Sequence, residues 1–295
     1  MPPSCTLEAP VGTCIFCGDH AKLTAEHLFA DWISRSFDST KPYRLYHENL
    51  AGEYREWESG SLDYKARLLC APCNNVRFSA LEERVKRLVE PMMLRGAPTT
   101  LTVDDQRALS AWIVKTMIVY NHMWDSADPE HLVYSAAERK TFTDTLSPPW
   151  GVLVWIGRFF GNTPEESAPI VGSFAGYDHT RPDLKGVQKY VLTFTLRQFA
   201  VQLLALKRFT DDAPPLSYLM HYFEPTRMWR QATHRIWPSL GKNVAWPRDV
   251  ILTRQAVQAL NERYGSDFAL WPGEVPIGLN AAFFLKDLGP VASTK

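Results

Sequence analysis

Two short stretches, Cys14-Ile15-Phe16-Cys17 and Cys70-Ala71-Pro72-Cys73, decide how the N-terminal part of this sequence folds. Each is a C-x-x-C knuckle, a turn that presents two thiolates to one edge of a metal ion, and two knuckles complete a tetrahedron. All five cysteines of the 295-residue chain fall in its first quarter, which argues against chance placement. We therefore expect a structural zinc ion on these four sulfurs, and we expect the remaining Cys5 to be inert.

Two alternatives to zinc stay open at this point. The cysteines could be unrelated core residues, or they could form a thiol redox pair. A thioredoxin-like motif would use one knuckle beside a βαβ unit and would leave the other unexplained, so zinc accounts for more of the pattern. A redox protein would show a reversible disulfide and no bound zinc.

The overall composition is that of a globular protein with one or two domains, since 45% of the residues are apolar and 22% are charged. The 32 Lys and Arg balance the 32 Asp and Glu, which excludes a strongly basic binder. The richest apolar stretch, 111–124, contains Lys115, Asn121 and His122, so we expect neither a membrane-spanning helix nor a membrane partner. The first residues show no basic and apolar leader, and a cytoplasmic location is expected.

Outward from the cysteines, the pattern predicts a knuckle, a short helix, a hairpin, a second knuckle and a long helix. Apolar residues at helical spacing indicate a short helix over 28–37 and a long one over about 74–89. Residues 53–57 and 63–69 suit two short strands, joined as a hairpin through 58–61, and the second strand leads directly into Cys70.

The stretch Gly96-Ala97-Pro98-Thr99-Thr100 predicts a boundary between domains 1–96 and 97–295. After it we expect a helix over 104–124, a helix that starts at a capping box of Ser135 and Glu138, and a last helix over 254–264 with Thr253 as its N-cap. Strands rich in β-branched and aromatic residues are expected at 152–159, 170–174, 190–196 and 199–206. The predicted fold class is α+β, a zinc-stapled N-terminal module followed by an α+β domain with an antiparallel sheet.

Residues that could take part in catalysis or bind a metal ion adjoin both knuckles. Leu23-Thr24-Ala25-Glu26-His27-Leu28 follows the first, and Asn74-Asn75-Val76-Arg77 continues the second. Together with the knuckles, these residues resemble the HNH endonucleases over about a quarter of the chain, roughly residues 14–82. The resemblance implies a ββα-metal fold with an acidic-His pair at the end of its first strand, an Asn or His at the start of its helix, and two knuckles that bracket the active site.

The resemblance also implies a role for each matching residue. His27 would be the general base, because an imidazole pKa near 6.5 suits proton abstraction at neutral pH. Glu26 and Asn74 would hold a catalytic magnesium or manganese ion, with positions left for water and phosphate. Arg77 would contact a phosphate. Asn49 is the best counterpart of the family's middle polar residue, and its distance from Cys70 suggests an insertion.

Each role has a purely structural alternative. Glu26 could cap the short helix, Asn74 could cap the long one, His27 could be a structural hydrogen-bonding residue, and Arg77 could lie on a solvated face.

A basic stretch near the C-terminus is the candidate surface for nucleic acid, because the first hundred residues hold only 12 Lys and Arg against 13 Asp and Glu. The predicted phosphate-binding residues are Arg227, Arg230, Arg235, Lys242 and Arg248. Trp229, Trp237 and Trp246 lie between them and would either stack on unpaired bases or serve as core anchors.

The sequence therefore predicts a phosphodiester hydrolase, a metal-dependent endonuclease that acts on nucleic acid, and on DNA in particular. The C-terminal domain would select the substrate or a protein partner. The alternative is a non-catalytic, zinc-stabilised adaptor that binds nucleic acid or protein.

Overall fold

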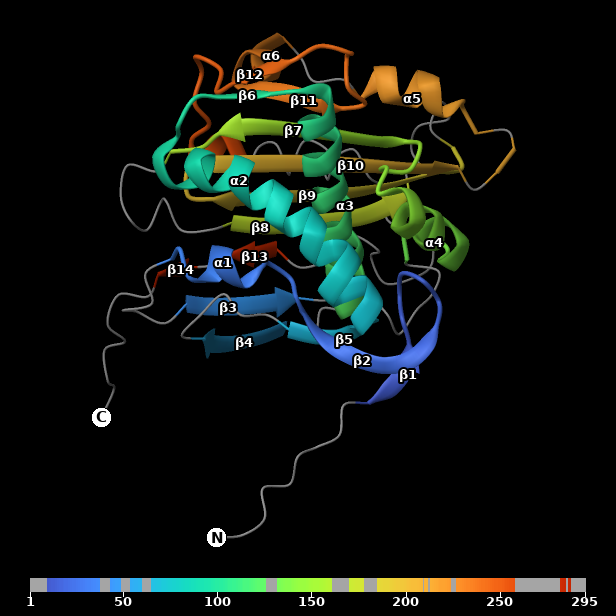
Figure 1. Ribbon diagram of the computed structural model, residues 1–295. Helices are drawn as coiled ribbons and strands as arrows, with labels where there is room; N and C mark the ends of the chain where they lie inside the picture. Colours follow the sequence, from blue (N-terminus) through green and yellow to red (C-terminus); the bar gives the residue numbers. More distant parts are fainter. Residues whose placement is uncertain are drawn as a thin grey trace, which may run out of the picture.

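The computed structural model describes residues 10–37, 43–48, 54–59, 65–125, 132–160, 170–177, 185–208, 210–211, 213–223, 227–257, 282–284 and 286–287. Helices and antiparallel sheets are combined in it, so the predicted α+β class is confirmed at that coarse level (Figure 1). In the described part of the chain, no helix is both long enough and apolar enough to cross a membrane.

The N-terminal part is a small sheet followed by a long helix. Strands β1 (Val11–Thr13), β2 (His20–His27) and β5 (Lys65–Cys70) form an antiparallel sheet with β2 in the middle. After Cys70 the chain enters a π-helical stretch, η1 (Pro72–Phe78), which continues directly into α2 (Ser79–Arg95). The predicted long helix is therefore confirmed and is extended at both ends. The predicted helix over 28–37 is confirmed only as the single turn α1 (Asp31–Ser34).

The predicted hairpin of 53–57 with 63–69 is wrong. Strand β4 (Tyr54–Ser59) pairs with β3 (Tyr43–Glu48), and these two join β14 (Lys286–Asp287) in a separate sheet. Strand β5 pairs with β2 instead, in a register that sets Leu23 opposite Cys70. The physical reason lies in the knuckles: β2 follows the first and β5 ends in the second, so this pairing is the one that brings the two cysteine pairs together.

A six-stranded antiparallel sheet forms the larger part of the molecule, in the order β11-β7-β10-β9-β8-β13. Its strands are β7 (Val152–Arg158), β8 (Ile170–Tyr177), β9 (Val187–Leu196), β10 (Phe199–Arg208), β11 (Thr233–Trp237) and β13 (Ala282–Phe284). The four predicted strands and their antiparallel pairing are thus confirmed. A short ladder of β6 (Thr99–Leu101) with β12 (Val244–Trp246) lies beside this sheet.

Helices α2 and α3 (Val103–Asp125) cross one face of the large sheet (Figure 1). Residues 108–122 of α3 are buried on all sides, which is expected for a helix that lies between another helix and a sheet. The remaining helices are α4 (Ala136–Thr145), α5 (Leu216–Tyr222) and α6 (Arg227–Ala232). The capping box of Ser135 and Glu138 is confirmed at the start of α4. Thr253 accepts a hydrogen bond from the Ala256 N–H as predicted, but the helix it caps is described only for 254–257.

Gly96 ends α2 in a left-handed conformation, with φ of 59°. A Cβ atom at this position would lie 2.3 Å from Gln198 Oε1, and that oxygen accepts hydrogen bonds from Arg158 Nε and Nη2 at 3.1 and 2.7 Å. The end of α2 is therefore packed tightly against β7 and the turn between β9 and β10.

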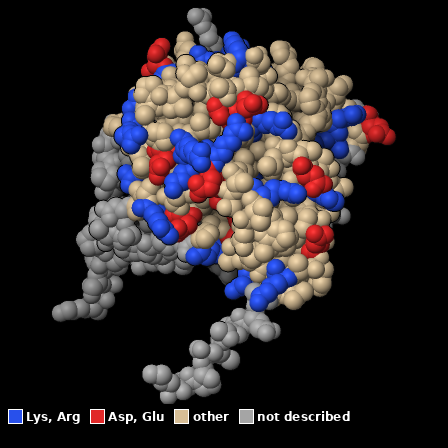
Figure 2. Space-filling view, in the orientation of Figure 1, with Lys and Arg blue, Asp and Glu red and all other residues tan. Residues whose placement is uncertain are grey.

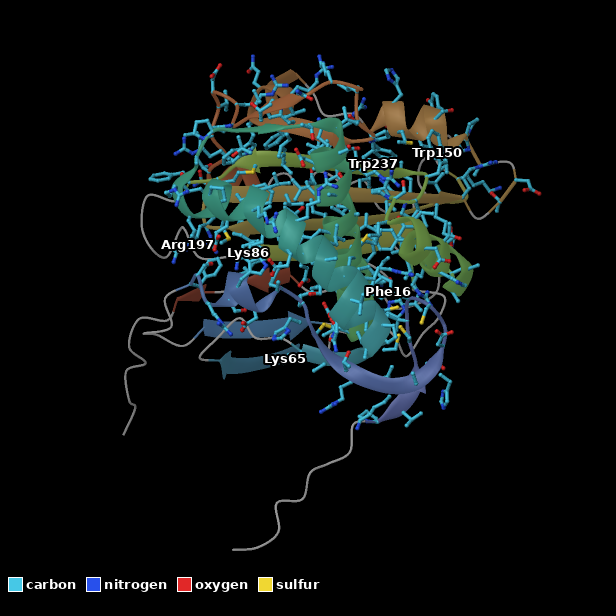
Figure 3. All side chains as sticks on the ribbon, in the orientation of Figure 1. Phe16, Lys65, Lys86, Trp150, Arg197 and Trp237 are labelled. Carbon is cyan, nitrogen blue, oxygen red and sulfur yellow. The ribbon has the colours of Figure 1, made fainter. Side chains whose placement is uncertain are left out.

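One hydrophobic core joins the N-terminal sheet to the large sheet. It includes Phe16 from the first knuckle, Phe78 from η1, Trp112 from α3 and Phe194 from β9 (Figure 3 labels Phe16). The ring centroids of Phe16 and Phe78 are 4.5 Å apart, and those of Trp112 and Phe194 are 6.0 Å apart. The predicted boundary at 96–100 coincides with the end of α2, and the core continues across it.

Candidate functional site

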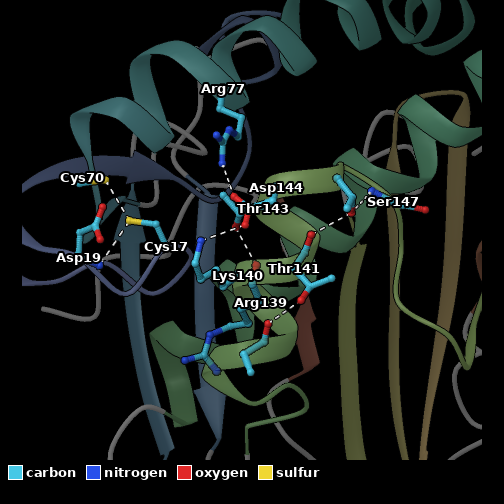
Figure 4. A network of polar contacts seen from close by, with 12 residues as sticks. Cys17, Asp19, Cys70, Arg77, Arg139, Lys140, Thr141, Thr143, Asp144 and Ser147 are labelled. Atoms are coloured by element: carbon cyan, nitrogen blue, oxygen red, sulfur yellow. Dashed lines mark hydrogen bonds and ion pairs between the residues drawn. The ribbon is translucent and has the colours of Figure 1, made fainter.

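The four knuckle cysteines meet at one point. The first knuckle is the turn between β1 and β2, and the second joins the end of β5 to η1. The four sulfur atoms all lie within 4.8 Å of one another, and Cys17 Sγ is 3.6 Å from Cys70 Sγ (Figure 4). Cys14, Cys70 and Cys73 are buried, Cys17 is half-buried, and all four are free thiols. This set of donors can bind a metal ion such as zinc, and the predicted sulfur cluster is confirmed.

The electrostatics of the cluster favour a cation. Burial raises the pKa of Cys17 to about 12, and burial together with the nearby Cys14 charge raises the pKa of Cys73. Burial also acts against ionisation of Cys14, but hydrogen bonds from the backbone of Cys70, Cys17 and Phe16 outweigh it and lower the pKa of that thiol. Four thiolates at this spacing repel one another, and a divalent cation removes that cost.

Helix α4 holds the first knuckle from outside the N-terminal sheet. Arg139 Nε donates a hydrogen bond of 2.6 Å to the Ile15 carbonyl oxygen, and Arg139 Nη1 contacts the Tyr134 carbonyl oxygen. The backbone between Cys14 and Cys17 is therefore anchored by a residue from the later part of the chain.

His27 and Asn74 line one cleft of about 650 Å³ between β2, α1 and α2. Asn74 Nδ2 donates to Thr24 Oγ1 at 2.9 Å and to the Ala25 carbonyl oxygen at 3.2 Å, so the start of the helix is tied to the end of β2. In this orientation its Oδ1 is directed away from those two partners. We call this space the acidic cleft, because it is lined by the carboxylates Glu26, Asp31, Glu82, Glu83 and Glu90 against the cations Arg35 and Lys86. Figure 3 labels Lys86, which projects from α2 toward α1.

The Glu26 carboxylate is engaged by a lysine that the sequence analysis did not select. Lys115 Nζ, from α3, forms ion pairs with Glu26 Oε1 and, at 2.7 Å, with Glu82 Oε1. The side chains of Lys115 and Glu26 are 1% and 4% exposed, so the pair is buried. Burial by itself would lower the pKa of Lys115, but the charges of Glu26 and Glu82 outweigh it and raise that pKa, so the ammonium group stays charged. One Glu26 oxygen is thus occupied by a cation from the protein itself.

A signal for Lys115 exists in the sequence. It is a charged residue inside the apolar run 111–124, where a helix buried all round needs a partner for any charge. Read in this way, Lys115 predicts a buried acidic partner, although the sequence does not say which one.

Arg77 does not meet His27, Glu26 and Asn74. Its Nη1 forms an ion pair of 3.2 Å with Asp144 Oδ1 of α4, and Asp144 also pairs with Lys140 (Figure 4). Arg77 lines a second cleft, of about 390 Å³, on the opposite flank of the long helix. We call this space the basic cleft, because the charged residues that line it are Arg77, Arg84, Arg107 and Asp104.

The remaining predicted residues lie elsewhere. Asn49 and the side chain of Arg227 are outside the described residues. Arg230, Lys242 and Arg248 are exposed, and Arg235 is half-buried on β11, where burial lowers its pKa.

The tryptophans of the same stretch are mostly interior. Trp246 is packed in the core, with its ring 6.3 Å from that of Phe199, and Trp229 is also buried. Trp237 is only partly buried (Figure 3). Trp229 and Trp246 therefore act as anchors, and they do not offer a ring face to a nucleic-acid base.

Comparison of this chain with protein-family models, with curated proteins and with solved structures gives no match.

Proposed function

We propose that this chain is a metal-dependent endonuclease that hydrolyses phosphodiester bonds in DNA with a water molecule activated by His27. One observation carries the proposal: β2 pairs with β5, and β5 leads into the long helix, so that His27 and Asn74 line the same cleft beside the four-cysteine cluster. The resemblance to the HNH endonucleases implies two strands followed by a helix. In that arrangement a histidine stands at the end of the first strand and an amide side chain at the start of the helix.

The chemistry assigned to His27 is that of a general base. A ring nitrogen accepts a proton from water as the oxygen attacks phosphorus in line with the departing 3′ oxygen. The phosphorus to 3′ oxygen bond breaks, and the products are a 5′-phosphate and a 3′-hydroxyl. Asn74 keeps the end of β2, and with it His27, at the start of the helix through its bonds to Thr24 and Ala25.

The cleft also contains oxygen donors of the kind that hard cations prefer. Glu26, through the carboxylate oxygen that does not contact Lys115, and Asn74, through its amide oxygen, would hold magnesium or manganese, and the ion would supply Lewis-acid stabilisation of the charge that develops on phosphate. Zinc on the four cysteines would have no open position and would serve only the fold.

The buried pair of Glu26 and Lys115 favours one alternative function. A carboxylate already neutralised by an ammonium group attracts a divalent ion less strongly, and the remaining acidic residues of the cleft repel phosphate. A protein that uses the zinc module only for stability, as an adaptor, would tolerate this arrangement.

Nicking of supercoiled plasmid in the presence of magnesium or manganese distinguishes the two functions. We expect wild-type protein to convert the plasmid to the nicked form and His27→Ala to reduce the rate by at least about a hundredfold while remaining folded. His20→Ala is the matched control, because His20 is an exposed histidine on the same strand and lies outside the cleft. Equal nicking by wild type and His27→Ala, or no metal-dependent nicking by either, would refute the hydrolytic proposal.

A further inference from the structure

The basic cleft brings together three arginines from two helices. Arg77 and Arg84 lie one heptad apart on the long helix, and Arg107 lies in the second turn of α3. Two alanines, Ala80 and Ala108, also line the cleft and leave room between the helices. The lining residues carry three positive charges against the single carboxylate of Asp104.

Neighbouring groups orient these guanidinium groups and leave most of their donors available. Arg84 Nη2 is 3.2 Å from Asp105 Oδ1, Arg77 Nη1 is 3.2 Å from Asp144 Oδ1, and Arg107 Nη2 donates to the Thr145 carbonyl oxygen at 3.0 Å. A guanidinium group carries five N–H donors, and each of these contacts uses one terminal nitrogen. The side chains of Arg77 and Arg84 are 42% and 49% exposed, so a ligand can reach them from solvent.

The two aspartates remain ionised and hold the arginines in place. Partial burial acts to raise the pKa of Asp105, but hydrogen bonds from Thr102 and Arg84 outweigh it and lower that pKa. A hydrogen bond from Lys140, helped by Arg77, lowers the pKa of Asp144. Both carboxylates contact the arginines from the rim, and neither lines the cleft itself.

We propose that the basic cleft binds a backbone phosphate of DNA, with Arg84 and Arg107 as its principal ligands and Arg77 beside them. Guanidinium groups match the paired oxygens of a phosphodiester, and three of them line the basic cleft against one carboxylate, with Asp105 and Asp144 paired to two of them at the rim, whereas the acidic cleft is lined mainly by carboxylates. The inference rests on the proposed function for the identity of the polyanion, and it assigns the positive surface that hydrolysis of DNA requires.

The position of the cleft agrees with this role. The same helix carries Glu82 and Lys86 into the acidic cleft and Arg77 and Arg84 into the basic one. Figure 2 shows lysine and arginine side chains gathered over α2 on this face, with acidic side chains between them. A strand of DNA laid across α2 would therefore place one phosphate near His27 and another between the arginines.

Fluorescence anisotropy of a short labelled DNA duplex in the presence of EDTA measures binding without cleavage. We expect the double variant Arg84→Gln, Arg107→Gln to lose affinity by about tenfold at 100 mM salt, and the slope of log affinity against log salt to become shallower by about two. The matched control removes the same charge from exposed positions on the N-terminal sheet, Lys22→Gln with Arg67→Gln, and should change affinity less than about twofold. Thermal unfolding checks that the variants fold, and Arg84→Lys with Arg107→Lys should retain most of the salt dependence.

Equal losses in both double variants, or no measurable binding by wild type, would overturn the inference. The binding and nicking experiments together test this inference independently of the hydrolytic proposal. Binding that depends on the arginines without any nicking leaves the inference standing and refutes hydrolysis. Nicking without any dependence of binding on Arg84 and Arg107 refutes the inference and leaves hydrolysis standing.

Discussion

The acidic and basic clefts share one wall, the long helix formed by η1 and α2, but the side chains that line them differ in charge. Asn75 and Glu82 line the acidic cleft, whereas Arg77 and Arg84 line the basic one. Each pair is separated by seven residues, which is close to two helical turns, so each pair keeps to one side of the helix. A two-residue offset then moves a side chain to the opposite flank. Helical periodicity alone can therefore separate charges of opposite sign onto two surfaces.

The two clefts also differ in how deeply their ion pairs are buried. Glu26 of the acidic cleft forms a buried ion pair with Lys115 behind it, whereas the ion pairs of the basic cleft are between one-fifth and one-half exposed. Exposed pairs contribute little to stability, and a broken buried pair is costly because it leaves an uncompensated charge. The acidic cleft is therefore tied to the folded core through Glu26, whereas the ion pairs beside the basic cleft lie at the surface.

Substitution of a cysteine of the four-sulfur cluster should destroy both clefts together. Cys70→Ser is expected to abolish stoichiometric zinc binding and to lower the free energy of unfolding by about 5 kcal/mol or more, because the β2–β5 pairing and the start of the long helix both adjoin the sulfurs. Elemental analysis and chemical denaturation measure the two effects. Cys5→Ser is the control and should leave both unchanged. A Cys70→Ser protein of wild-type stability would show that the knuckles do not support the clefts.

Loss of the buried lysine should show that the ion pair behind the acidic cleft matters more for stability than an exposed charge. Lys115→Met leaves Glu26 as a buried carboxylate without its counter-charge, and we expect the free energy of unfolding to fall by roughly 3 to 5 kcal/mol. The double variant Lys115→Met, Glu26→Gln should recover much of that loss in a double-mutant cycle. Lys86→Met, at the rim of the same cleft, is the control and should change stability by no more than about 0.5 kcal/mol. Equal effects of the Lys115 and Lys86 substitutions would contradict the assigned difference in depth.

Acid should test the stability of α3, the helix whose Lys115 pairs with two carboxylates of the acidic cleft and whose Arg107 lines the basic cleft. Burial, assisted by the charge of Arg139, lowers the pKa of His122 to about 4, although the Ile118 carbonyl oxygen opposes this shift. Between pH 6.5 and pH 4 the unfolded state binds a proton that the folded state does not, so stability falls as the pH falls through this window.

The expected contribution of His122 is up to about 3 kcal/mol at pH 4, and it should be absent above pH 6.5. Denaturant titrations of wild type and His122→Gln at several pH values measure it as the difference between their slopes. His20→Gln, at an exposed position, should keep the wild-type slope. A His122→Gln protein with an unchanged slope would show that this end of α3 is more open to solvent than its burial indicates.

The smallest expected effect concerns α4, which borders only the basic cleft. Ser135→Ala removes the N-cap of this helix and should lower the free energy of unfolding by about 1 kcal/mol. Thr141→Ala, at an exposed position in the same helix, is the control and should be close to neutral. If both substitutions prove neutral, the capping box does not contribute to the wall of the basic cleft.

Much of the fold could be predicted because its signals are local. The spacing of the cysteines, the capping box at Ser135 and the β-branched runs of the large sheet each depend on a few neighbouring residues. Strand partners could not be predicted in the same way. The residues of β4 and β5 suit strands, but nothing in their own pattern states that β5 pairs with β2 across more than forty residues.

The candidate site shows the same limit. The sequence predicts catalytic or metal-binding roles for His27, Glu26 and Asn74, and all three line the acidic cleft. The sequence predicts Arg77 beside Asn74, one α-helical turn on, but both residues lie in the π-helical stretch η1, where three positions fall well short of a full turn, and Arg77 pairs with Asp144 of α4 on the other flank. Lys115 comes from a helix that follows the predicted module, so only the tertiary structure reveals its contact with Glu26.

The glycine that ends α2 has a further consequence. Any side chain at residue 96 would have to occupy space already taken by Gln198 and Arg158, in a backbone conformation that favours glycine. A Cβ atom would displace the flexible ends of the Gln198 and Arg158 side chains and break the hydrogen bonds between them, which tie the turn between β9 and β10 to β7. The left-handed backbone at residue 96 would stay strained in any such variant, so a substitution should weaken the junction between the long helix and the large sheet, although Gly96 lines neither cleft.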